Sequence, residues 1–307
     1  MRQQRCGFNP YLNDSCHMAD GYEIYGKYDD SAHIDATGGW HDAADYLQYV
    51  ATSANATYQM LFAWSENPRS FGDEYRANGL PGSDGLPDVL NEIKWGLDWL
   101  LKMNPEPERM YNQIADDRDH VGFRFPNNDS ANYGKGFERP VYLCTGKPQG
   151  LFKHVNRATG IASTAGKFSS AFALGAEVYN SINPEFSGQL LTKAVAAFNY
   201  GLKYPGACQT APGTAPYFYE EDNWVDDMEL AAIELYNLTG DSKYLGYATE
   251  FGRQEITTPW MGKDTARHYQ WYPFVNMGHP GVARNQMTEN NGEFAGFMKK
   301  GLELTEL

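Results

Sequence analysis

Apolar residues recur at steps of three and four positions in about seven separate stretches of the chain, a spacing typical of amphipathic helices. The first predicted helix begins at or near Asp42 and runs to about residue 64. The second covers about residues 87–103, where Asn104-Pro105 stops it. No alternating pattern of comparable strength indicates a β-strand. The other predicted helices cover residues 162–179, 186–200, 225–238, 242–251 and about 293–304.

The order of these helices predicts an all-α fold. Short turns such as Thr239-Gly240-Asp241 join helices into pairs, longer loops separate the pairs, and an array of helical hairpins can close into a toroid. Residues 106–158 show no persistent helical pattern, and a loop of this length in a compact domain is usually functional. Because no change in composition marks an internal boundary, residues 1–307 are expected to form a single domain.

The charge of the chain narrows the range of partners. Its 25 basic and 39 acidic residues give a net charge of −14, which opposes binding to nucleic acid or to an anionic membrane surface. No apolar run reaches about 18 residues, so no membrane span is predicted. The residues after Met1 also lack the apolar segment of a signal peptide. The aromatic content of 14% suits a neutral polysaccharide, although packing in the core is the alternative for any single ring.

The segment from Gly38 to Tyr46, Gly-Gly-Trp-His-Asp-Ala-Ala-Asp-Tyr, holds the strongest candidates for chemistry. Asp42 and Asp45 are three residues apart, so at the start of a helix both carboxylates lie on one face of the first turn. The positive end of the helix dipole favours their ionised form, and such a pair can hold a water molecule and take its proton. The alternative is structural, with one Asp that caps the helix and a second in its first turn.

This segment is similar to the GGWxDAGD signature of family-nine glycoside hydrolases, with Ala44 where that family more often has Gly. Arg5-Cys6-Gly7 and Cys16-His17 resemble the subgroup that usually carries an immunoglobulin-like module before the catalytic domain, and no part of this sequence resembles that module. Further segments match the family in the same order along the chain: Gly85-Leu86-Pro87-Asp88, Asp116-Asp117-Arg118-Asp119-His120, Ala165-Gly166-Lys167 and His268-Tyr269-Gln270-Trp271.

The resemblance implies an (α/α)6 barrel and an inverting endo-β-1,4-glucanase, a cellulase acting on cellulose or a related β-glucan in a secreted or periplasmic location. By the family pattern, Asp45 is the general base and Asp42 helps to hold the attacking water. Packing in the core remains the alternative for each aromatic residue among the candidate glucan contacts. These candidates are Trp40, Tyr46, His120, Trp224 and Trp271.

Two cysteines and two histidines predict a metal site beside the same segment. Cys6, Cys16, His17 and His41 form a complete Cys2His2 set, which suits a structural Zn²⁺. A disulfide between Cys6 and Cys16 is the alternative, and His33 could replace His41. The resemblance favours zinc, since the subgroup holds a zinc ion in this region.

Residues 221–227, Glu-Asp-Asn-Trp-Val-Asp-Asp, place oxygen ligands just before a predicted helix, as a Ca²⁺ site requires. An acidic first turn stabilised by the helix dipole is the alternative. The resemblance implies a structural Ca²⁺ at the matching place, with Glu221, Asn223, Asp226 and Asp227 as ligands and Asp264 as a more distant candidate.

The proton donor of the implied reaction is not found in the sequence. An (α/α)6 barrel needs twelve helices, and the family's acid is the Glu of an Asn-Glu pair near the end of the domain, after a loop with His and Arg. Neither segment precedes Leu307, and Glu289 and Glu293 lie in a segment that resembles an earlier barrel helix. We therefore expect a catalytic domain without its last helices, with a non-catalytic β-glucan-binding protein or an inactive fragment as the alternative. The preferred glucan, endo versus exo action and the oligomeric state stay open.

Overall fold

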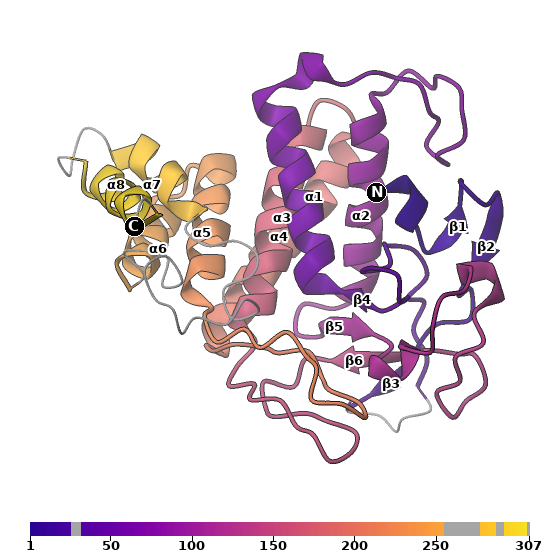
Figure 1. Ribbon diagram of the computed structural model, residues 1–307. Helices are drawn as coiled ribbons and strands as arrows, with labels where there is room; N and C mark the ends of the chain where they lie inside the picture. The colour runs from indigo at the N-terminus through magenta and orange to yellow at the C-terminus, as the bar shows by residue number, and fades with distance from the viewer. Residues whose placement is uncertain (26–31, 255–276, 287–291, 306–307) are drawn as a thin grey trace. The chain divides into compact units, whose positions relative to one another are not determined.

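The computed structural model describes residues 1–25, 32–254, 277–286 and 292–305 (Figure 1). The chain divides into two compact units. Met1–Asn156 with Thr210–Phe218 form the first unit, and Arg157–Gln209 with Tyr219–Leu307 form the second. Within the described ranges, no helix is long and apolar enough to span a membrane.

Two long helices pack together in the first unit, α1 (Val50–Glu66) and α2 (Asp88–Met103). The buried face of α2 carries Leu90, Ile93 and Leu97 at the three- and four-residue spacing of an amphipathic helix. The second predicted helix is therefore confirmed.

Two small sheets complete the first unit. β1 (Gly7–Asn9) pairs antiparallel with β2 (Asp14–Cys16). A second sheet has the strand order β3-β6-β5-β4, in which β3 and β6 are parallel and the other neighbours antiparallel. Its strands are β3 (Tyr22–Ile24), β4 (Gln48–Tyr49), β5 (Tyr111–Ile114) and β6 (Pro140–Leu143), and short 3₁₀ helices lie at Arg2–Gln4, Pro68–Ser70, Asp117–Asp119 and Pro126–Asn128.

The strands β5 and β6 correct the prediction that residues 106–158 are loop-like throughout. Each has four residues, and all of β5 and the first three residues of β6 are buried. A short strand that is buried on both faces shows no alternation of apolar and polar residues. The sequence pattern therefore carried no signal for this sheet.

Helix α1 begins at Val50, which corrects the predicted start at Asp42. Gln48 and Tyr49 pair with β5 as strand β4, so the backbone stays extended through Tyr49, with φ −126° and ψ 137°. Pairing with a neighbouring strand here outweighs the helical spacing of the preceding apolar residues. Asp42 and Asp45 therefore lie in the bend before β4, outside the first turn of the helix, where the helix dipole does not act on them as predicted.

The described part of the second unit consists of helices. Asn183 caps α4 by accepting the backbone N–H of Phe186 at 3.1 Å, and Gly240 ends α5 with φ 70°. Helix α7 was not predicted, because two glycines and a proline in its first turn argue against a helix. The six helices are α3 (Ala162–Tyr179), α4 (Pro184–Lys203), α5 (Val225–Thr239), α6 (Ser242–Gln254), α7 (Gly278–Gln286) and α8 (Glu293–Thr305).

Helix α3 is buried along almost its whole length and packs against both α4 and α5. Its many Ala, Gly and Ser residues let the neighbouring backbones come close. A Cβ added to Gly166 would lie 2.7 Å from the backbone of Asp227 in α5. This close approach places Lys167, the next residue of α3, beside the start of α5.

Candidate active site and metal centre

Asp45 lies in the bend before β4 with its two carboxylate oxygens in different surroundings. Its Oδ2 lies 3.1 Å from Nε2 of His120. Its Oδ1 is buried and has no hydrogen-bond partner among the described residues. The side chain of His120 is 46% exposed, so the pair connects a partly buried carboxylate to solvent. The backbone N–H of Asp42, which is half-buried, donates to the carbonyl of Leu47 at 2.8 Å and closes the bend.

Burial raises the pKa of Asp45 above its ordinary value, and the negative charge of Asp119 acts in the same direction. His120 opposes this shift through its charge and its hydrogen bond. The net effect is a carboxylate that accepts a proton more readily than an exposed Asp does. This property suits a general base.

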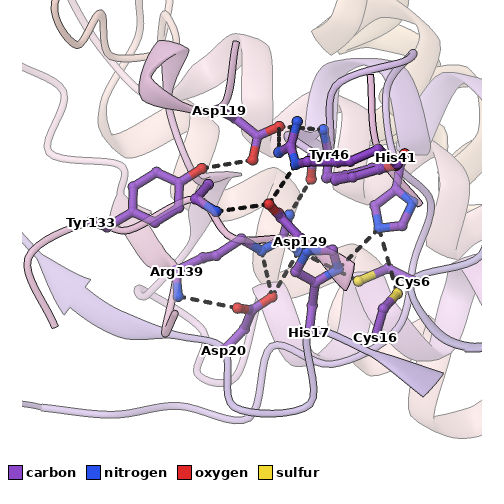
Figure 2. Close-up of polar contacts among 12 residues, drawn as sticks. Cys6, Cys16, His17, Asp20, His41, Tyr46, Asp119, Asp129, Tyr133 and Arg139 are labelled. Atoms are coloured by element: carbon purple, nitrogen blue, oxygen red, sulfur yellow. Dashed lines mark hydrogen bonds and ion pairs between the residues drawn. The ribbon is translucent and has the colours of Figure 1, made fainter. Parts of the chain in front are cut away.

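Asp119 fixes the backbone at Tyr46, the residue after Asp45, and Figure 2 shows Asp119 beside Tyr46. Its buried carboxylate accepts the backbone N–H of Tyr46 at 2.6 Å, the Arg124 guanidinium at 2.9 Å and the Tyr133 hydroxyl at 2.8 Å. Three donors on one carboxylate define its position and that of Tyr46. Asp119 is therefore a positioning residue. In the sequence it stood out only as part of the segment at residues 116–120 that resembles the family.

Two predicted glucan contacts pack inside the unit, which favours the alternative of packing in the core. Trp40 is 3% exposed, and its Nε1 donates to Glu92 at 2.6 Å. Tyr46 is 6% exposed, and its ring centre lies 4.7 Å from that of His41. Both rings fill interior volume and satisfy their polar atoms there. His120 alone of the three candidates in this unit reaches the surface.

Cys6, Cys16, His17 and His41, hereafter the Cys/His group, bring one ligand atom each to within 4.8 Å of one another. His41 Nε2 lies 3.4 Å from His17 Nδ1 and 3.9 Å from Cys16 Sγ. Around a tetrahedral zinc ion, with Zn–N of 2.0–2.1 Å and Zn–S of 2.3 Å, such atoms lie roughly 3.3–3.8 Å apart. The residues present therefore fit zinc.

The alternatives to this ligand set do not match the structure. All four cysteines of the chain are free, so Cys6 and Cys16 do not form a disulfide. His33 lies outside the group, with its Nε2 3.2 Å from the Ala19 carbonyl and 3.3 Å from Glu138. His41 is accordingly the fourth member.

Neighbouring side chains orient the Cys/His group (Figure 2). The Nε2 atom of His17 lies 3.0 Å from Asp129 Oδ2, which leaves Nδ1 directed at the group. A carboxylate on the far nitrogen is the usual support of a metal-bound histidine. Arg139 donates to Cys6 Sγ at 3.4 Å and is itself held by Asp20 at 2.7 Å. Asp129 also accepts from Arg124 at 2.5 Å, so hydrogen bonds connect the group with Asp119.

A family model for glycosyl hydrolase family 9 matches residues 1–296. The chain belongs to glycosyl hydrolase family 9. Endoglucanase 1 of Arabidopsis thaliana is 29% identical over 231 residues, which are 74% of this chain and 41% of that protein. This family-nine chain thus spans less than half the length of that relative.

Two solved family-nine structures resemble this chain. A metagenome-derived family-nine endoglucanase matches with a TM-score of 0.71 and 26% identity over 98% of this chain and 51% of its own. A zinc-binding triple mutant of the family-nine endoglucanase J30 matches with a TM-score of 0.69 and 26% identity, over 98% of this chain and 53% of its own. Family membership and these matches confirm the predicted (α/α)6 fold class, to which the described residues contribute eight helices.

The second predicted metal site of this family-nine chain comprises residues 221–227, hereafter called the acidic turn. A lysine of helix α3, which the prediction did not consider, contacts this turn. Lys167 Nζ lies 2.5 Å from Asp227 Oδ2 and also contacts Glu221 Oε1. The side-chain oxygen of Asn223 accepts the backbone N–H of Trp224 at 2.9 Å. The residues present hold an ammonium where the prediction places a calcium ion.

The remaining candidates follow later in the sequence. Trp224 is half-buried, and its ring centre lies 5.8 Å from that of Phe251. Trp271, Asp264 and Glu289 lie outside the described residues. Glu293 pairs with Arg253 at 2.8 Å, and this pairing lowers the pKa of Glu293. A lowered pKa is the opposite of what a proton donor needs, which agrees with leaving Glu293 without a catalytic role.

Proposed function

We propose that this chain is the greater part of the catalytic region of an inverting endo-β-1,4-glucanase acting on cellulose or a related β-glucan. Family membership supports the reaction class, and Asp45 supports the mechanism. The observation that carries the proposal is a partly buried carboxylate of raised pKa in the family signature, with one oxygen on His120 and the other without a side-chain partner among the described residues. The proposed substrate, a polymer outside the cell, favours a secreted or periplasmic location.

In the proposed mechanism, Asp45 takes a proton from a water molecule that Asp42 helps to hold. The water attacks the anomeric carbon from the face opposite the leaving group, so the product has inverted configuration. Rigid positioning of the base comes from Asp119, which holds the backbone at Tyr46. A separate acid must protonate the leaving oxygen, and we propose that it lies outside the residues described here.

A substrate that needs no acid isolates the proposed role of Asp45. Dinitrophenyl β-cellobioside has a leaving group that departs without protonation, so the chain should hydrolyse it even if the acid is not supplied. The same chain should hydrolyse a soluble cellulose derivative poorly, because loss of acid catalysis costs about 10²–10⁴ in rate.

Asp45→Asn should reduce hydrolysis of the activated substrate by about 10²–10⁴. The matched control is Asp98→Asn, at an exposed Asp that pairs with Lys94 on the surface of α2. Its rate should equal that of the wild type. Equal rates for Asp45→Asn and wild type would disprove the assignment, and a β-anomeric product in the NMR spectrum would disprove inversion.

A non-catalytic glucan-binding protein is the second candidate function, since the acid is not assigned to any described residue. This alternative predicts binding of cellohexaose in calorimetry with no hydrolysis of either substrate. Rapid hydrolysis of the cellulose derivative would instead show that the chain contains its own acid.

We also propose that the Cys/His group binds one structural Zn²⁺. When bound, the ion would join strands β1 and β2 to the segment that begins the signature, since Cys16 lies in β2 and His41 precedes Asp42. Four protein ligands leave no coordination position open for substrate water, so the ion would stabilise the bend and not perform hydrolysis.

A further inference from the structure

Lys167 is a fully buried cation in the second turn of α3, and charged residues are rarely buried unless they are paired. Its side chain is 1% exposed and extends from α3 to the acidic turn. There the ammonium contacts Glu221 and Asp227, which are 6% and 2% exposed. A lysine held in this way neutralises carboxylates that water cannot reach.

The acidic turn holds three buried carboxyl groups against one lysine, and burial raises the pKa of each of them. Asp226, 5% exposed, is the third buried carboxylate, and its Oδ1 has no hydrogen-bond partner in the described part of the chain. Although burial alone would lower it, the pKa of Lys167 is raised, because the charges of Asp227, Glu221 and Asp226 favour the ammonium. Lys167 therefore stays charged throughout the physiological range.

The position of the ammonium decides between lysine and metal. Ca²⁺ binds six to eight oxygen atoms at about 2.3–2.6 Å. Lys167 Nζ lies at this same separation, 2.5 Å, from Asp227 Oδ2, and it also contacts the Glu221 carboxylate. A calcium ion coordinated by both carboxylates would coincide with the ammonium, and two cations cannot occupy one position.

We propose that Lys167 is the internal cation of the acidic turn, which joins α3 to the start of α5 without bound calcium. We also propose that the Lys167 ammonium prevents a divalent cation from binding to the acidic turn. Removing this ammonium leaves Glu221, Asp226 and Asp227 as a buried set of oxygen atoms that a divalent cation can bind. This inference is independent of the proposed glucanase function, because its test uses neither glucan nor hydrolysis.

The wild-type chain provides the first test. Its melting temperature is measured with CaCl2 and with a calcium chelator that leaves the metal of the Cys/His group in place, at constant ionic strength and with MgCl2 as control. We expect shifts below about 1 °C, because a ligand that does not bind the folded state cannot stabilise it. A calcium-dependent rise that disappears in Asp226→Asn would overturn the proposal, whereas a rise that persists in Asp226→Asn places calcium elsewhere and leaves it intact.

Lys167→Ala and Lys167→Met provide the second test. Both should melt at lower temperature than wild type, and calcium should restore part of the loss in Lys167→Ala, where the vacated volume admits the ion. The matched control is Lys243→Met, which removes a surface lysine paired with Asp241 at 2.9 Å and should not respond to calcium.

Wild-type stability in both Lys167 variants, without a calcium response, would show that the lysine is not the cation that the turn requires. If neither variant folds, the calcium titration of the wild type decides by itself.

Discussion

The Cys/His group and the acidic turn were predicted as metal sites from the same kind of signal, a set of suitable ligands close in sequence, yet their surroundings differ. Around the Cys/His group, Asp129 contacts His17 and the Arg139 guanidinium contacts Cys6, so each neighbour touches a single member. At the acidic turn, Lys167 brings an ammonium into contact with two of the predicted ligands.

This difference shows that a set of suitable ligands can bind a metal ion only where no neighbouring side chain occupies the position of the ion. Cys6 and His41 come from segments 35 residues apart, but backbone hydrogen bonds from Cys6 to Gly39 and from His41 to Gln4 bring them together. Among the described residues, no other group of three or more Cys, His, Asp or Glu side chains converges in this way. In the acidic turn, the cation comes from Lys167, which lies 54 residues before Glu221. The spacing of ligands within the turn therefore cannot reveal this contact.

The largest effect is expected at the Cys/His group. Cys16→Ser should abolish zinc retention and lower the free energy of unfolding by about 5 kcal/mol or more, since a structural zinc contributes an apparent 10–16 kcal/mol in zinc-finger peptides. Elemental analysis and urea unfolding measure the two effects. Cys144→Ser, at a buried cysteine outside the group, should keep one zinc per chain. Equal zinc content in Cys16→Ser and Cys144→Ser would show that the Cys/His group does not bind the zinc ion.

Lys167→Met should have the next largest effect. Removing one partner from a buried ion pair costs about 3–5 kcal/mol, because the other charges stay buried without compensation. Urea unfolding at neutral pH measures this loss. Lys243→Met should leave the urea unfolding curve almost unchanged, because an exposed ion pair contributes little to stability. A similar loss of stability in Lys167→Met and Lys243→Met would mean that the buried lysine stabilises the fold no more than an exposed one does.

Asp119→Asn tests whether the Cys/His region affects the candidate base. The variant keeps the shape of the side chain but offers one good acceptor to three donors, so unfolding should become easier by about 2–3 kcal/mol. Hydrolysis of the activated cellobioside should fall while zinc content stays the same. The exposed Asp98→Asn should change neither quantity. A variant with lost stability but full activity would make Asp119 structural only.

The sequence predicted the helices well, because their apolar faces are long and periodic, and α3 and α5 begin at the predicted residues. It predicted the Cys/His group because that chemistry depends on residue type. It failed where pairing between distant segments decides the outcome. Strand β4 moved the start of α1 to Val50, and the hydrogen bond from buried Trp40 to Glu92 was not predicted. Local spacing contains no information on such partners.

The smallest expected effect is on the pKa of Asp45, and it can be measured without turnover. Burial raises this pKa and His120 lowers it, so His120→Gln should move the pKa of Asp45 further upward. A base works only when ionised, so hydrolysis of the activated substrate should fall as the pH drops through the pKa, and the variant should lose activity at a higher pH than wild type. Titration of the Asp45 carboxyl carbon by NMR gives both values directly. Lys94→Gln, which leaves His120 in place, should reproduce the wild-type value. A pKa that falls in His120→Gln would mean that the imidazole does not stabilise the ionised carboxylate, and the pairing at 3.1 Å would then have to be a contact in which His120 accepts a proton from Asp45.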